Sequence, residues 1–306
     1  MDIKCILEFY AFRVVPTKSI KNALSINFNI KCMEEIYNRI ELGLRNHVIG
    51  KRIYHYKKLK STQLLAISLA ENNIKNEEGT VIIADQQDEG RGRGKKKWSS
   101  PIGGLWMSLI IKPRIEFTKF NMISVISAIS VCESINRISQ LKTSILWPND
   151  VLFNNKKLAG ILIDSSINNS INDYVVIGIG INIDIDISKI NLSNASNSIL
   201  SRKVTSIQNE IKGRAIDRFM LMKQILEKIE LYLSLLEYDK YNSIIIDVYK
   251  QLFDTLGKKI IVYQDGLKKY NATLKDIDTY GGLILERDDN SLEKIYSGQI
   301  SIRENN

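Results

Sequence analysis

The hydrophobic and polar positions of this chain repeat with two periods, one typical of strands and one typical of helices. Six runs have the length and apolar character of strands: 52–56, 79–86, 103–113, 144–147, 158–164 and 174–183. Three longer segments place apolar side chains three and four positions apart and predict helices: 61–73, 119–139 and 214–237. Strands and helices in this order predict a mixed α+β domain with one main sheet.

The pattern of apolar and turn-forming residues changes after about residue 250. Short strand-like runs follow one another, divided by Gly and Asp, and no helical spacing remains, which predicts a small all-β barrel of about 55 residues. Near the N-terminus, residues 33–44 have the apolar spacing of a helix. We therefore expect an N-terminal extension, partly helical and of unknown function, then a mixed-sheet domain and a small β-barrel: 1–46, 47–249 and 250–306.

The composition is that of a globular protein, because 44% of the residues are hydrophobic and 25% are charged. Three widely separated cysteines argue against a disulfide framework or a zinc ribbon, and the two histidines suggest neither a metal site nor a Ser-His-Asp triad. We expect no metal held by protein side chains. Charges interrupt the N-terminal apolar run, and the other apolar stretches fall short of the roughly 18 to 20 residues of a membrane span. A soluble, cytoplasmic protein is expected.

The loop GRGRGKKKWSSP, residues 90–101, concentrates positive charge on a flexible backbone. The chain carries a net charge of +9, and five cations lie in the octet 90–97. The loop fails as a dinucleotide fingerprint because no helix follows its glycines, and as a P-loop because Gly94-Lys95 is not followed by Ser or Thr. Three interpretations remain: a lid for an anionic ligand, tethered by its flanking strands, a basic patch for nucleic acid, and a solvated loop.

A second unusual segment is ILWPNDVLFNNKKLAGILID, residues 145–164. Two apolar strands flank an Asn-rich turn, which is ordinary hairpin chemistry. The Trp-Pro-Asn-Asp sequence is less ordinary, because it aims two short polar side chains past the end of a strand. Further on, Gly178 and Gly180 face the same side of a strand, which indicates either a bulge or the close approach of a ligand or backbone.

Together these segments resemble biotin–protein ligases over residues 47–303. The motifs occur in the order and spacing of that family: STQ (61–63), QQDEGRGRGKKKWSSPIGGLWMSL (86–109), WPND (147–150), KKLAGILID (156–164) and GIGIN (178–182). The basic loop and the WPND…KKLAG pair are specific signatures, whereas GIGIN alone would be weak. The tail SGQISIR resembles the end of the family's C-terminal domain. The resemblance implies a class II synthetase-like catalytic domain with a mixed sheet, followed by an SH3-like β-barrel.

The resemblance also implies an ATP-dependent ligase that works in two steps. Biotin and ATP, the latter expected with Mg²⁺, give biotinyl-5′-AMP and pyrophosphate. A lysine of a biotin carrier domain, the expected partner, then attacks the mixed anhydride. The basic loop would fold over biotin and the adenylate phosphate, with its cations facing the developing negative charge.

The family's site residues can be carried over position by position. Three cations match catalytic positions: Lys157, Arg93 and Arg91. Biotin contacts fall on Ser61, Thr62, Gln87, Gly90, Arg91 and Gly92, and on the backbone of Gly160 and Ile161. Adenine-side positions are Trp98, Asn149 and Asn182, and a C-terminal arginine near the nucleotide matches Arg303. The expected binding set is completed by Gln63, Lys96, Asp150 and Gly180.

Several positions depart from the family pattern. Leu146 stands before WPND where Lys is usual, Gln63 replaces Asn, and Lys95 and Lys96 replace Gly and Arg in the loop. Lys96 keeps the charge but not the bidentate geometry of Arg. Leu146 removes a cation expected near the reaction centre, which either slows the reaction or is compensated by Lys156.

Two alternatives stay open. One is a lipoate- or octanoyl-transferring enzyme of the same fold, which is not expected to carry the basic loop together with WPND. The other is a basic nucleic-acid-binding regulatory protein, which interleaved aromatic residues would favour, and only Trp98 is nearby. Residues 1–46 match neither the family core nor a winged helix-turn-helix, so we expect no DNA-binding domain, no specific nucleic acid and no membrane partner. A homodimer is compatible with the family.

Overall fold

The computed structural model describes residues 48–166, 173–190, 203–211, 215–264, 267–296 and 300–304. All of them belong to one compact unit, residues 47–306, which is distinct from residues 1–46. The helix predicted at 33–44 and the expected absence of a DNA-binding domain concern residues outside the described ones, and both stay predictions.

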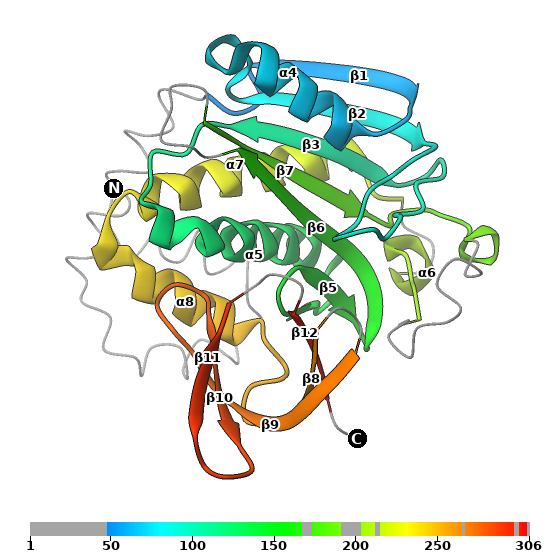
Figure 1. The fold of residues 1–306 in the computed structure, drawn as a ribbon. Coiled ribbons are helices and arrows are strands. Elements are labelled where there is room, and N and C mark those ends of the chain that lie inside the picture. Colours follow the sequence, from blue (N-terminus) through cyan, green and yellow to red (C-terminus); the bar gives the residue numbers. More distant parts are fainter. Residues whose placement is uncertain are drawn as a thin grey trace, which may run out of the picture. The chain divides into compact units, whose positions relative to one another are not determined.

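The main sheet has seven strands in the order β1-β2-β3-β7-β6-β5-β4 (Figure 1). Their bounds are β1 Arg52–Leu59, β2 Thr80–Gln87, β3 Leu105–Ile111, β4 Ser144–Leu146, β5 Asp150–Phe153, β6 Lys156–Ser166 and β7 Tyr174–Ile181. Strands β1 and β2 run parallel and every other neighbouring pair is antiparallel. The mixed sheet predicted from the sequence is therefore confirmed.

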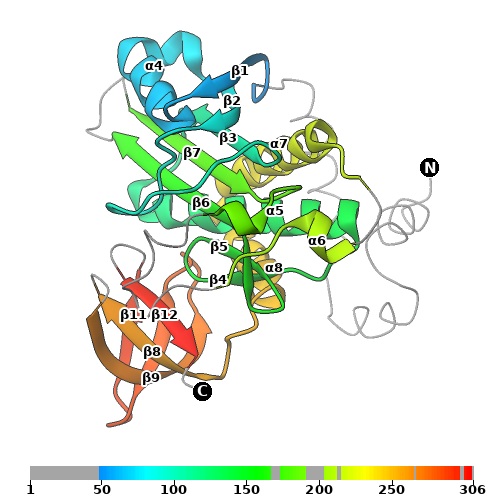
Figure 2. The same cartoon turned by 90° about the vertical axis from the view of Figure 1, so that its right-hand side faces the viewer.

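Helices cover both faces of this sheet (Figures 1 and 2). Helix α4, Thr62–Glu77, packs on one face through Ala66 and Ala70, whose small side chains let it lie close to Ile82, Ile110 and Val176. Helix α5, Phe120–Ser139, lies on the opposite face and contacts helices α7, Arg218–Leu236, and α8, Asn242–Gln251. The expectation that every apolar stretch is too short for a membrane span is wrong for helix α5, which has the length and apolarity of one, but most of it is buried in the core of the described unit.

The C-terminal strands form a separate antiparallel sheet in the order β11-β10-β9-β8-β12, called here the C-terminal β-domain (Figure 2). Its strands are β8 Lys259–Gln264, β9 Leu267–Ile277, β10 Leu283–Arg287, β11 Leu292–Ile295 and β12 Ile300–Glu304. Alternating buried residues such as Leu283 and Leu285 give it a small core of its own. The predicted change to an all-β segment is confirmed.

Four strands and α-helices were not predicted, namely β5, α6, α8 and β11, and one helix begins later than expected. Helix α8 has a run of three isoleucines, which reads equally as a strand, and β11 has exposed side chains at two of its four positions, which hides its alternation. Helix α7 begins at Arg218 rather than 214 because the Asp217 side chain caps it, accepting hydrogen bonds from the backbone of Phe219 and Met220. A short helix, α6 Ile207–Ile211, follows the segment 203–206.

Candidate active site

One row of residues runs across five strands of the main sheet. The register pairs Trp106 of β3 with Gly180 of β7, Gly180 with Gly160 of β6, Gly160 with Asp150 of β5, and Asp150 with Leu146 of β4. Directly paired residues of antiparallel strands point to the same face of a sheet. The row therefore places two residues without side chains between an indole and a carboxylate.

The two glycines of this row form a floor for Trp98, the residue that ends the basic loop. A Cβ atom at Gly160 would lie 2.7 Å from the Trp98 ring, and one at Gly180 would lie 2.7 Å from its Nε1. The Trp98 Nε1 group is buried and has no hydrogen-bond partner in the described part of the chain. Glycine at both positions is thus explained by the close approach of a flat ring rather than by a bulge.

The hairpin between β5 and β6 sets the position of Lys157. Its two-residue turn consists of Asn154 and Asn155, whose φ angles of 48° and 61° fit the left-handed conformation that tight hairpin turns require. Lys157 is also held from its other side, because its backbone N–H donates to Lys203 O at 2.8 Å and its carbonyl accepts from Thr205 N at 3.0 Å. The cation therefore projects from backbone that is fixed at both edges.

The side chain of Lys157 faces the row of glycines. Its Nζ lies 2.7 Å from Asp150 Oδ1 and 4.9 Å from the centre of the Trp98 ring, and the side chain is 26% exposed. The neighbouring Lys156 points elsewhere: its Nζ lies 2.9 Å from Glu210 Oε1, and its side chain is 41% exposed. Hydrogen bonds from Lys156 and Thr205 lower the pKa of the Glu210 carboxyl. The two adjacent lysines thus occupy different environments.

Arg93 brings a second cation from the basic loop to the same turn. Its Nη1 donates to Asn149 Oδ1 at 3.3 Å, and its Nη2 donates to Ile300 O of the C-terminal β-domain at 3.1 Å. Burial lowers the pKa of Arg93, and the nearby Asp150 carboxylate opposes that effect. Asn149 is itself fixed, because its Nδ2 donates to Ile161 O and its carbonyl accepts from Ile161 N.

A polar cluster lies where helix α4 begins. The Gln87 amide oxygen accepts from the backbone N–H of Thr62 at 2.7 Å and from its hydroxyl at 3.1 Å. Ser108 Oγ lies 2.9 Å from both Thr62 Oγ1 and Gln63 Oε1. Gly178 makes room for this arrangement, because a Cβ atom there would collide with the Gln63 amide oxygen. The cluster offers fixed donors and acceptors inside an otherwise apolar part of the sheet.

The basic loop folds over this face as a short ribbon. Arg91 and Lys97 form an isolated antiparallel bridge, and Gly92 N donates to Lys96 O at 2.8 Å. Gly90 O accepts from Trp98 N at 2.8 Å. Arg91 Nη1 lies 3.5 Å from Asp164 Oδ2, and that carboxylate also accepts from Gln63 Nε2 at 3.0 Å. The loop is therefore tied to the polar cluster at one end and to the glycine floor at the other.

The remaining predicted residues have mainly structural contacts in the described part of the chain. Ser61 directly precedes helix α4, and its Oγ accepts from Leu64 N at 3.4 Å. Asn182 is buried and donates from its side chain to Thr205 O at 2.9 Å. The backbone of Arg303 pairs with Ile261 in the C-terminal β-domain, but its side chain lies outside what the structure describes. Leu146, the departure before WPND, is 8% exposed and lies beside Asp150 in the row.

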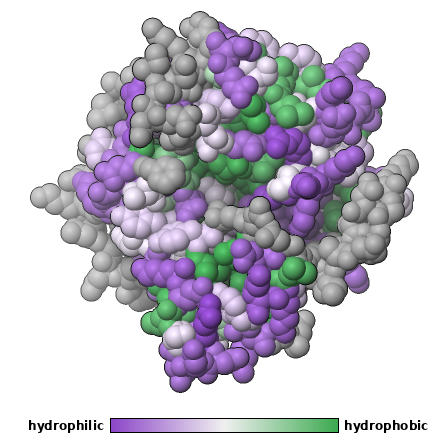
Figure 3. Space-filling model, in the orientation of Figure 1, coloured by the Kyte–Doolittle hydropathy of each residue, from purple (hydrophilic) through white to green (hydrophobic). Residues whose placement is uncertain are grey.

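Two residues of the site were missed by the sequence analysis. Ser108 is fully buried between Thr62 and Gln63, and the signal for it was a single hydroxyl inside the apolar run LWMSLII. The Asp164 carboxylate contacts both Arg91 and Gln63. It is the last residue of the KKLAGILID motif, and the sequence had not indicated a contact for it. Figure 3 shows hydrophobic atoms gathered across the middle of the face seen in Figure 1, with hydrophilic atoms around them.

Two family models match this chain. The model described as the biotin/lipoate A/B protein ligase family covers residues 56–182, and the one described as the biotin protein ligase C terminal domain covers residues 255–303. The first includes all the motifs of the main sheet, and the second covers the C-terminal β-domain. Both halves of the described unit are therefore matched separately.

Individual relatives agree with the family models. The chain is 33% identical over 272 residues to the bifunctional ligase/repressor BirA of Bacillus subtilis, covering 87% of this chain and 78% of that protein. It is 28% identical over 230 residues to the protein of the same name from Salmonella typhimurium, covering 74% of this chain and 67% of that protein. Among solved structures, the biotin protein ligase from Aquifex aeolicus in complex with biotin and ATP is similar, with a TM-score of 0.67 and 27% identity over 83% of this chain and 100% of that one. Together with the geometry of the site, these matches show that the chain belongs to the biotin–protein ligase family.

Proposed function

We propose that this protein is an ATP-dependent biotin–protein ligase whose two cations, Lys157 and Arg93, promote the adenylation of biotin. The observation that carries the residue assignment is that both cations reach the Asn149–Asp150 turn, beside the glycine floor of Gly160 and Gly180. The alternative of a lipoate or octanoyl enzyme is disfavoured, because the C-terminal match is to a biotin ligase domain.

The chemistry explains why two cations are needed. In the first step a carboxylate oxygen of biotin attacks the α-phosphorus of ATP, a P–O bond to the β-phosphate breaks, and pyrophosphate leaves. Both reactants are anions, so a fixed positive charge between them reduces their repulsion and stabilises the charge that builds on the phosphoryl oxygens. Mg²⁺ would be bound as part of the ATP substrate.

In this arrangement each part of the site has one task. The polar cluster of Thr62, Gln63, Gln87 and Ser108 would pair with the ureido group of biotin, because it offers fixed donors and acceptors. The basic loop would fold over the phosphates. Trp98 lies on the glycine floor, so a flat group that binds there would have to displace the indole or stack against it.

The second step would transfer biotin to a carrier domain. The amine of a carrier lysine attacks the acyl carbon of biotinyl-5′-AMP, AMP leaves, and the amine loses a proton as the amide forms. We propose the biotin carrier domain of a biotin-dependent carboxylase, in the cytoplasm, as the acceptor. The chemistry of the proposed partner is thus an exposed lysine on a small folded domain.

The test is the mass of an unbiotinylated carrier domain after incubation with the protein, ATP and biotin. We expect a mass gain equal to one biotin minus one water, which requires both substrates. A carrier whose acceptor lysine is replaced by arginine is the control and should not change. Transfer of lipoate or octanoate instead of biotin, or no transfer at all, would contradict the proposal.

Replacing Thr62 by valine is expected to weaken biotin binding about fivefold, since one buried hydrogen bond to the ligand is worth on the order of 1 kcal/mol. Valine keeps the shape of threonine, and the backbone N–H of residue 62 still reaches Gln87. Calorimetric titration with biotin alone measures the effect. Thr273→Val, in the C-terminal β-domain, is the matched control. Equal affinity of the Thr62 variant and the parent protein would remove this hydroxyl from the biotin site.

A further inference from the structure

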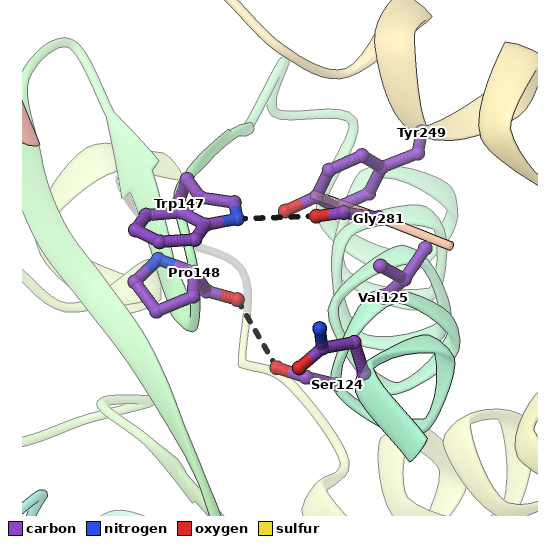
Figure 4. A pocket seen from close by; sticks show the side chains of 7 residues that line it. Ser124, Val125, Trp147, Pro148, Tyr249 and Gly281 are labelled. Atoms are coloured by element: carbon purple, nitrogen blue, oxygen red, sulfur yellow. Dashed lines mark hydrogen bonds between the residues drawn. The ribbon is translucent and has the colours of Figure 1, made fainter. Parts of the chain in front are cut away.

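A small pocket lies where helix α5 and the C-terminal β-domain meet the WPND motif (Figure 4). Its lining comes from four segments far apart in the sequence: Asn121, Ser124 and Val125 of α5, Trp147 and Pro148 of the motif, Tyr249 of α8, and Gly281 of the turn between β9 and β10. None of these residues has a place in the proposed chemistry. Their contacts nevertheless determine how the motif is held.

Trp147 and Pro148 are held from two sides. Trp147 Nε1 donates to the carbonyl of Gly281 at 3.3 Å, and the carbonyl of Pro148 accepts from Ser124 Oγ at 3.1 Å (Figure 4). Trp147 is 3% exposed, so water does not reach its indole N–H, and the Gly281 carbonyl serves as the hydrogen-bond acceptor instead. The C-terminal β-domain and helix α5 thus each form a hydrogen bond with one of the two residues that come immediately before Asn149 and Asp150.

The turn that supplies Gly281 is itself rigid. It spans 278–282, and the Asp278 carboxylate accepts hydrogen bonds from the backbone of Tyr280 and Gly282, both at 2.9 Å. The hydroxyl of Tyr296, which directly follows β11, donates to the same carboxylate at 2.6 Å. Gly281 adopts φ +80°, and a Cβ atom there would lie 2.6 Å from Val125 Cγ2. Only glycine therefore lets the turn seat against α5.

We infer that the turn 278–282 is a positioning element for adenylation, which acts on Asn149 and Asp150 through the Trp147–Gly281 hydrogen bond. Asn149 holds Arg93, and Asp150 holds Lys157, so the angle of the WPND turn decides where both cations point. The polar cluster at the start of α4 does not depend on this contact. The inference rests on the proposed adenylation and predicts that the turn affects the chemical step without affecting biotin binding.

The first experiment compares Trp147→Phe with Tyr249→Phe. Phenylalanine keeps a ring in the pocket but removes the N–H, and we expect single-turnover formation of biotinyl-5′-AMP to slow about tenfold, because small displacements of catalytic groups are costly. The dissociation constant for biotin alone should stay within about twofold of the parent value. Tyr249→Phe is the matched control, since its buried hydroxyl has no partner in the described residues and its removal should leave the rate unchanged.

A second set of variants keeps the test decisive if Trp147→Phe does not fold. Gly281→Ala should slow adenylation, because the new methyl group pushes the turn away from Val125. Adding Val125→Ala to Gly281→Ala opens the space again and should restore at least part of the lost rate. The single Val125→Ala variant completes the cycle, so the coupling between the two positions is measured directly.

The outcomes separate the inference from the function on which it rests. If the parent protein forms no biotinyl-5′-AMP, the proposed function fails. If the parent is active and both Trp147→Phe and Gly281→Ala have its rate, or if biotin binding falls by the same factor as the rate, the positioning role is wrong. A rate loss confined to adenylation, with relief by Val125→Ala, supports it.

Discussion

Replacing Lys157 by alanine is expected to slow the formation of biotinyl-5′-AMP on the order of 100-fold or more. The Lys157 ammonium lies 2.7 Å from Asp150, and its backbone N–H and carbonyl are both hydrogen-bonded to the segment 203–205. A cation fixed in this way needs no rearrangement when charge develops on the phosphate, whereas a solvated lysine would contribute little. Single-turnover formation of the adenylate, measured by rapid quench, gives the rate of the affected step.

Lys156→Ala is the control for this prediction. Lys156 precedes Lys157 directly and has the same charge, but it pairs with Glu210 on the side away from the glycine floor. Its loss should leave adenylation near the parent rate and change the free energy of unfolding by about 1 kcal/mol or less, because the Lys156 side chain is largely exposed even though Glu210 is half-buried. Equal damage from both substitutions, or a near-normal rate for Lys157→Ala, would exclude the role assigned to Lys157.

Arg93→Ala is expected to reduce adenylation about 100-fold as well, because it removes the second charge and its contacts to Asn149 and Ile300. Lysine at this position should restore only part of the rate, since an ammonium lacks the planar fork that reaches two acceptors at once. Steady-state ATP–pyrophosphate exchange at saturating biotin measures both variants.

Lys95→Ala in the same loop separates a specific role from bulk charge. Lys95 is exposed, and it lies two positions from Arg93. Its loss should have little effect, because an exposed charge in a flexible loop is screened by salt. If Lys95→Ala reduced the rate of adenylation as much as Arg93→Ala does, the loop would act through its total charge, and the role assigned to Arg93 would be wrong.

The sequence predicted the fold class and most strands because the apolar periods of this chain are clear. It failed where a local pattern is ambiguous. The three isoleucines of α8 suit a strand as well as a helix, and only packing against α5 decides between them. The later start of α7 was readable in principle, because Asp217 is a good capping residue, but the apolar period continues before it.

The parts of the site that belong to short sequence motifs could be predicted. The loop, WPND and KKLAG were recognised, and the structure brings Arg93, Asn149, Asp150 and Lys157 together. What could not be predicted depends on register across strands. The alignment of Gly160 with Gly180 under Trp98, and the meeting of Ser108 with Thr62, join residues 20 to 82 positions apart. No local period carries that information.

The tight turn of Asn154 and Asn155 has a consequence for the direction of the lysine that follows it. Successive side chains on a strand alternate between faces, so losing one residue from this turn would move Lys157 to the face that Lys156 now occupies. Such a deletion would leave the composition of the motif almost unchanged and yet turn Lys157 away from Asp150 and the glycine floor. The spacing between WPND and KKLAG therefore matters for adenylation as much as the lysine itself does, although neither asparagine need touch a ligand.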